Sequence, residues 1–181
     1  AYSNVGVLAD IKLRSKSTGL SAQTSAKSDK EVAMAGIMGR FSQVPLQGAG
    51  FDFNASLFKS QKHGRDEALD SEATWIRTEG NIVLSGQVGQ NSSIYGLGGL
   101  NLAHLTVANS SESIDPLGIG LQIGVGAAFN QNLNFELVYA GTRHRVAKKL
   151  RDEADRNGLE IVDDESGFTF RGMMARLTYS F

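Results

Sequence analysis

Apolar and small residues alternate without interruption between Leu117 and Phe129. Every odd position in this segment is apolar, whereas the even positions are glycine except for Gln122 and Ala128. Because successive side chains of a β-strand point to opposite faces, the pattern predicts a strand with one apolar face and one nearly bare face. A soluble sandwich would carry polar side chains on the second face. Glycine there indicates a cramped interior with the apolar face turned to lipid, and about 9–11 tilted residues suffice to cross a bilayer as a strand.

Similar alternation recurs along the chain and predicts eight strands. The predicted strands are Asn4–Arg14, Glu31–Ser42, Phe51–Lys62, Ala73–Leu84, Ser93–Val107, Leu117–Phe129, a segment that begins at Leu133, and Phe168–Phe181. The connections alternate between long and short, which is typical of a membrane barrel with short periplasmic turns and long extracellular loops. We therefore predict an all-β fold of one domain, 1–181. It is a transmembrane antiparallel up-and-down β-barrel of eight strands, with both termini on the periplasmic side.

The positions opposite the apolar parity are expected to point inward, and many of them are charged. The inward set is Asp10, Lys12, Arg14, Arg40, Asp52, Arg77, Glu79, Glu136 and Arg176. Such a set could line a narrow channel or an active site, but eight strands leave an interior barely wide enough for side chains. Because unpaired buried charge is costly, the mixed signs favour an interior network. We expect Glu136 to pair with Arg176, and Arg40 with Asp52, on neighbouring strands.

Composition narrows the classes of function. The chain has 181 residues, a net charge of −1 and no cysteine. The balanced charge argues against a nucleic-acid partner, which would require a basic surface. The absence of cysteine excludes disulfides and thiolate metal sites. There is also no run of about 18 apolar residues that would predict a membrane helix.

The three histidines bear on two alternatives to a binding barrel, a metal site and a lipid-modifying enzyme. His63, His104 and His144 are far apart and form no local metal motif. His104 with Ser110, Ser111 and Glu112 contains the residue types of an outer-membrane lipid A deacylase, but no motif matches. The sequence therefore predicts no enzyme, no cofactor and no metal site, while a lipid-modifying enzyme and a narrow channel stay as alternative functions.

The last strand carries the clearest family resemblance. The apolar parity Ala175, Leu177, Tyr179 and Phe181 ends on an aromatic residue, which resembles the recognition signal of Gram-negative outer-membrane proteins. It implies the barrel-assembly machinery as a partner through Phe181. Together with the glycine-rich segments Ser93–Gly99 and Leu117–Phe129, this ending resembles the small eight-stranded barrels of the OmpX and Ail/Lom attachment-invasion group, and the OmpA transmembrane domain. The resemblance implies adhesion, with host surface or matrix molecules as partners.

A charged insertion, Arg143–Gly167, is longer than a barrel turn requires, and long loops without a structural duty are usually functional. Val146, Leu150 and Ala154 have helical spacing and predict a short helix. The basic half is expected to contact phosphate groups of lipopolysaccharide or sulfated glycans through Arg143, Arg145, Lys148, Lys149 and Arg151. An equally open alternative is a solvated loop whose basic and acidic halves pair with each other.

Aromatic residues gather at the strand ends beside the turns. They are Tyr2, Phe41, Phe51, Phe129, Phe135, Tyr179 and Phe181. A girdle at the membrane interface explains this placement without a ligand.

Overall fold

A computed structural model describes residues 3–16, 21–60, 73–107, 114–129, 132–162 and 166–179. For 3–13, 21–34 and a few strand-end positions it describes the backbone alone. The elements in chain order are β1 Ser3–Ser15, β2 Ser21–Gln43, β3 Gly48–Ser60, β4 Ala73–Gln87, β5 Ser92–Val107, β6 Ile114–Phe129, β7 Leu133–Val146, α1 Lys148–Arg156, β8 Leu159–Ile161 and β9 Gly167–Tyr179. No helix among these residues is long and apolar enough to cross a membrane.

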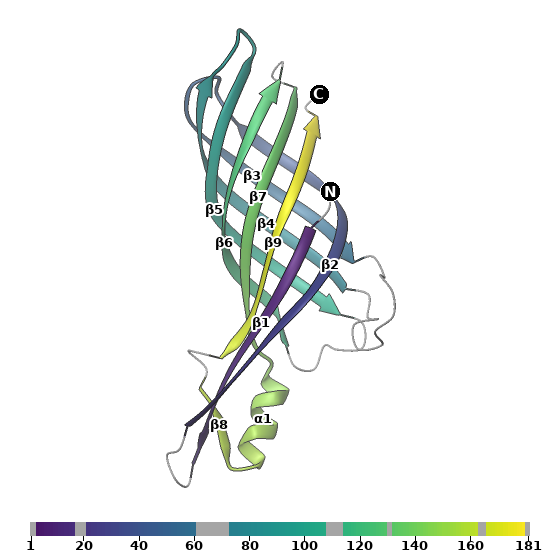
Figure 1. Cartoon of the computed structure of the whole chain (residues 1–181), viewed down its shortest axis with the longest axis vertical. Coiled ribbons are helices and arrows are strands. Elements are labelled where there is room, and N and C mark those ends of the chain that lie inside the picture. Colours follow the sequence, from purple (N-terminus) through teal and green to yellow (C-terminus); the bar gives the residue numbers. More distant parts are fainter. Residues whose placement is uncertain are drawn as a thin grey trace.

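The strands form a closed antiparallel barrel. Consecutive strands from β1 to β7 pair with each other, β7 pairs with β9, and β1 closes the ring by pairing with β9. Within the described residues this ring has eight strands, so the predicted architecture is confirmed. The short β8 pairs with β1 outside the ring. Figure 1 shows β9 ending beside the short connections and β1 beginning part-way along the barrel, whereas α1 and β8 project at the opposite end, called here the long-loop end.

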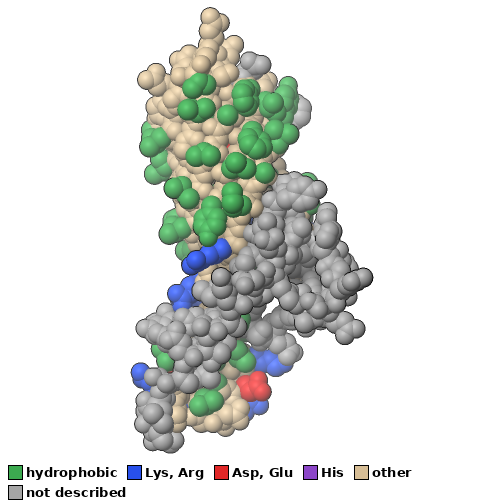
Figure 2. Space-filling view, in the orientation of Figure 1, with side chains coloured by type: hydrophobic (Ala, Val, Ile, Leu, Met, Phe, Trp, Pro, Cys, Tyr) green, Lys and Arg blue, Asp and Glu red, His purple; other side chains and the backbone are tan. Residues whose placement is uncertain are grey.

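Burial in the barrel is inverted relative to a soluble protein. The exposed fraction is 69% for Leu121 and 70% for Leu177, whereas it is 1% for Glu136. Apolar side chains are spread over the outer wall in Figure 2. The alternation predicted for β3, β4, β6 and β7 is therefore confirmed, with the apolar parity outward. Since β-strand side chains alternate, the inward parity must fill the lumen.

Glycines on the inward face of β6 make room for large neighbours. A Cβ atom at Gly126 would overlap the ring of Tyr95, and one at Gly118 would lie 2.6 Å from Nε2 of His144. These glycines confirm the cramped interior. The interior is not uniformly polar, however, because the apolar parity of β5 points inward, including Tyr95 and Leu97.

Two predicted loops are partly wrong. The predicted loop from Ser15 to Lys30 is mostly strand, because β2 begins at Ser21, which lies opposite Arg14. The pairing of β1 with β2 extends past the apolar part of β2. The added part of β2 is rich in serine and lacks the apolar alternation that would have indicated a strand. Likewise, β7 continues to Val146, so the insertion begins at Ala147 rather than Arg143.

Exposed aromatic side chains lie near the short connections. Phe41 and Phe51 flank the turn between β2 and β3, with ring centroids 6.0 Å apart. Phe129, Phe135 and Tyr179 are exposed around the turn between β6 and β7. This placement is typical of an interface girdle. Tyr2 and Phe181 lie outside the described residues.

Candidate functional site

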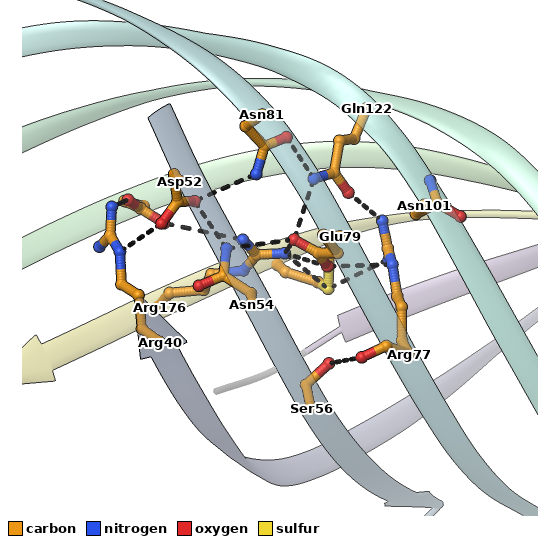
Figure 3. A network of polar contacts seen from close by, with 12 residues as sticks. Arg40, Asp52, Asn54, Ser56, Arg77, Glu79, Asn81, Asn101, Gln122 and Arg176 are labelled. Carbon is orange, nitrogen blue, oxygen red and sulfur yellow. Dashed lines mark hydrogen bonds and ion pairs between the residues drawn. The ribbon is translucent and has the colours of Figure 1, made fainter. Parts of the chain in front are cut away.

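The centre of the lumen holds Glu79 between two arginines. The carboxylate oxygens of Glu79 lie 2.6 and 2.8 Å from Nη2 of Arg176. Nε of Arg77 lies 3.0 Å from Oε1 of the same carboxylate. All three side chains are buried, and Figure 3 shows Arg176 from β9 meeting Arg77 and Glu79, which both come from β4.

A second carboxylate, Asp52, is fully buried toward the short-connection end. It accepts hydrogen bonds from Nε of Arg40 at 2.6 Å, from Asn54 at 2.6 Å and from Asn81 at 3.1 Å. These three donors come from β2, β3 and β4. The hydrogen bonds from these donors offset part of the cost of removing the carboxylate from water.

Glu136 joins the two centres. Its carboxylate lies 2.8 Å from Nη2 of Arg40 and 3.7 Å from Nη1 of Arg176, and it accepts a 2.7 Å hydrogen bond from the hydroxyl of Tyr95. Glu136 and Arg176 are direct partners in the register of β7 and β9. Both pairs expected from the sequence are therefore present, although the shortest contacts of Arg176 go to Glu79.

Gln122 bridges residues of this network. Its amide nitrogen donates to Glu79 at 2.9 Å and to the side-chain oxygen of Asn81 at 2.5 Å, while its oxygen accepts from Arg77. The network has three arginines and three carboxylates and is formally neutral: Arg40, Arg77, Arg176, Asp52, Glu79 and Glu136. Neutral, hydrogen-bonded clusters are the form in which buried charge is tolerated.

Above the network, toward the long-loop end, the lumen is filled by aromatic rings. Phe170 contacts Trp75 and His144 edge-on, with ring centroids 5.5 and 5.3 Å apart. Phe58 and Leu105 are buried near the same level. The lumen is thus filled by a charged layer and then by an aromatic layer.

The other predicted interior residues fall outside this cluster. Arg14 is exposed and lies in the extension of β1, opposite Ser21 and Glu160, so its assignment to the interior is wrong. For Asp10 and Lys12 only the backbone is described, with Asp10 opposite Gly167 and Lys12 opposite Gln23. Arg14 lies outside the lumen because β1 continues beyond the barrel body, where neither face of the strand encloses a lumen.

Sequence reasoning did not single out the uncharged members of the network. Tyr95, Asn54, Asn81 and Gln122 contribute hydrogen bonds that connect the charges. All four lie on the inward parity of their strands, which is the signal that could have identified them.

Of the residues named in the enzyme alternative, only His104 lies in the described part of the chain. His104 is exposed on the outer wall of β5, whereas His144 is buried in the lumen. His63, Ser110, Ser111 and Glu112 lie outside the described residues. Among the residues that are described, no cluster of three metal-ligating side chains occurs.

The insertion at the long-loop end is a folded element. α1 spans Lys148–Arg156 and includes Leu150 and Ala154, so the predicted helix is present, although Val146 belongs to β7. β8 follows and pairs with Leu13–Ser15 of β1.

Lys16 ties α1 to the end of β1. Its Nζ lies 2.7 Å from Oδ1 of Asp155, and its backbone N–H donates to the carbonyl of Gly158 at 3.1 Å. The hydrogen bond to Asp155 and the charge of this carboxylate raise the pKa of Lys16 above its ordinary value. The insertion is therefore held against β1 by backbone and side-chain contacts.

The predicted basic contact residues divide between two places. Arg143 and Arg145 are exposed on the outer wall at the end of β7, rather than in a loop. Lys148 and Lys149 are exposed in the first turn of α1, and Arg151 is half-buried. No acidic residue occupies that first turn. The positive end of the helix dipole therefore coincides with two lysines, which strengthens the local positive potential.

No protein-family model and no curated protein sequence matches this chain. Among solved structures, Neisserial surface protein A (NspA) matches at 15% identity and a TM-score of 0.46, covering 99% of this chain and 97% of that chain. Ail, the attachment invasion locus protein of Yersinia pestis, matches in complex with the heparin analogue sucrose octasulfate at 15% identity and a TM-score of 0.41, covering 99% and 98%.

Proposed function

We propose that this protein is an integral outer-membrane barrel whose folded insertion binds anionic molecules at the cell surface. The inverted burial carries the proposal: apolar side chains cover the outer wall while six charged side chains fill the lumen. An apolar wall of this kind is stable only when lipid covers it. The short connections and both termini would then lie on the periplasmic side.

The filled lumen favours surface binding over a channel. Ion pairs and amide hydrogen bonds cross the barrel at the level of Glu79, and the rings of Trp75, His144 and Phe170 fill the next level. Water and ions would have to displace both layers. The binding function therefore belongs to the outer surfaces.

The ligand class follows from the start of α1. Lys148 and Lys149 lie in the first turn of α1, where the positive end of the helix dipole favours anions. β8 and the Lys16–Asp155 ion pair hold this helix in place. We therefore propose sulfated glycans of host surface or matrix as ligands of the insertion.

Sucrose octasulfate is a suitable probe because it is compact and rich in sulfate groups. Titration of the detergent-folded protein should show binding at low salt that weakens with added salt, since screening reduces exposed charge interactions. The double variant K148Q/K149Q should weaken binding by about fivefold, as expected for two exposed ion pairs. The matched control D152N/E153Q removes charges from the same helix and should not weaken binding. Equal affinity of K148Q/K149Q and wild type would refute the assignment.

A further inference from the structure

We infer that the outer wall of β7 and β9 carries a site for the phosphate groups of an outer-leaflet lipid, formed by Arg143, Arg145 and Arg171. This inference rests on the proposed membrane location but not on ligand binding by α1. Arg171 was not among the residues predicted from the sequence.

The strand register places the three arginines together on one face. Arg143 lies opposite Thr169, Arg145 opposite Gly167, and Arg171 opposite Gly141. Directly paired residues share a face, and diagonal pairs such as Arg143 and Arg171 are about 7–8 Å apart, within reach of long side chains. All three arginines are exposed on the outside of the barrel.

Two of the arginines lie across glycines of the neighbouring strand. A Cβ atom at Gly167 would be 3.1 Å from Nε of Arg143, and one at Gly141 would be 3.7 Å from Cγ of Arg171. The absence of a side chain at these two positions lets the arginines lie against the wall. A guanidinium held in this way loses less conformational freedom when it binds a phosphate, which it can contact through two parallel N–H groups.

The site lies where the apolar wall ends. Toward the short connections, the exposed outward neighbours are Met173 on β9, Tyr139 on β7 and Leu121 on β6. Toward the long-loop end, β7 leads directly into the charged helix. Figure 2 shows lysine and arginine side chains at the lower limit of the wall that is studded with apolar residues. Lipid headgroups occupy this boundary in a membrane-embedded barrel.

Charge is segregated between the two faces of the barrel. Wherever the side chains of the barrel strands are described, the carboxylates Asp52, Glu79 and Glu136 all face the lumen. The described outer wall carries arginine and lysine instead. A wall of one sign at headgroup level fits anionic lipid.

Arg171 distinguishes a lipid from a soluble sulfated polymer as the occupant. It precedes the exposed Met173 by two residues and lies opposite Gly141, which pairs with the exposed Leu121. A soluble polymer bound to Arg171 at the edge of the apolar wall would leave these apolar side chains uncovered. A lipid presents its phosphate there while its acyl chains cover the apolar side chains.

Native mass spectrometry of the folded protein with lipid A tests this inference. Wild type should retain bis-phosphorylated lipid A about fivefold better than lipid A without its phosphates. The double variant R145Q/R171Q should lose this preference, whereas R145K/R171K should keep most of it, which separates charge from a structural role. Lys59→Gln, on the outer wall of β3, is the matched control and should retain the preference.

The outcomes separate this site from the proposed function. Retention of phosphorylated lipid A by R145Q/R171Q at the wild-type level would overturn the lipid site, as would an equal loss in Lys59→Gln. Sucrose octasulfate binding should be unchanged in R145Q/R171Q. If the barrel is not embedded in lipid at all, wild type will retain neither form of lipid A, which would instead refute the membrane location.

Discussion

Arg176 on β9 and Glu79 on β4 form the shortest ion pair across the lumen, although four strand-to-strand steps separate them around the barrel. Nη2 of Arg176 lies 2.6 Å from Oε1 of Glu79, and Arg77 contacts the same carboxylate. In a ring of eight strands these two elements are diametrically opposite. The ion pair therefore connects opposite walls of the barrel, whereas the backbone hydrogen bonds connect adjacent strands around its circumference.

Removing the ion pair between Glu79 and Arg176 should destabilise the barrel strongly. Glu79→Gln leaves Arg77 and Arg176 with less compensating charge, and breaking a buried pair costs about 3–5 kcal/mol. Urea unfolding in lipid vesicles, followed by tryptophan fluorescence, measures the loss. Asp155→Asn removes an exposed carboxylate and should change stability by less than about 1 kcal/mol. Equal stability of Glu79→Gln and wild type would show that the network is dispensable.

We expect that only glycine fits at position 126, because the ring of Tyr95 lies against its backbone. A Cβ atom there would lie 2.7 Å from the hydroxyl oxygen of Tyr95, so Gly126→Ala should cost about 1–3 kcal/mol through overpacking. Gly98→Ala on β5 is the matched control, because the nearest atom to its Cβ would be 3.9 Å away. Similar unfolding midpoints for the two variants would argue against a tightly filled lumen.

The exposed apolar wall should respond to charge as a lipid-facing surface does. Leu121→Arg places a charge on the apolar outer wall of β6, where a lipid-facing arginine costs from about 1 kcal/mol near the interface to about 2–4 kcal/mol at the bilayer midplane. The same change at an exposed position in water would be nearly neutral. Val88→Arg, in the connection between β4 and β5, is the control and should have little effect. Heat-modifiable gel migration and folding yield in vesicles provide the measurement, and a neutral Leu121→Arg would refute burial of this wall in lipid.

Attachment of α1 should depend on the charge of Lys16. Its pKa is raised from 10.5 in the folded state by Asp155, so the stabilisation is fully present below pH 10.5 and is lost as the pH rises through the raised value. The chain has no cysteine, so Glu153→Cys provides a single spin-labelling position on α1. Label mobility should increase above pH 10.5.

A Lys16→Met variant is the control for this titration. Its label should already be mobile at pH 8 and should show no further change at high pH. An identical pH response in Lys16→Met and wild type would assign the transition to another group.

Most residues of the outer wall could be predicted from the local periodicity of the sequence. The alternation from Leu117 to Phe129 was sufficient to predict a strand, its outward-facing apolar parity and a crowded interior, because a β-strand assigns every second residue to one face independently of distant contacts. The inward parity of Arg40, Asp52 and Glu136 followed in the same way. The serine-rich start of β2 could not be predicted by this reasoning, because its sequence has no apolar alternation.

The partners of the inward residues were decided only by the tertiary structure. Closure and register bring Glu79 to Arg176 from opposite sides of the ring, and they place Tyr95 over Gly126. Neither contact follows from a fixed spacing in the sequence, because each depends on the register between several pairs of strands. The same holds for Arg171, whose neighbour Arg143 lies on another strand, and for Lys16, which meets Asp155 across 139 positions of the chain. The alternation of side chains thus determined which face each residue occupies, and the closed register determined which residues meet.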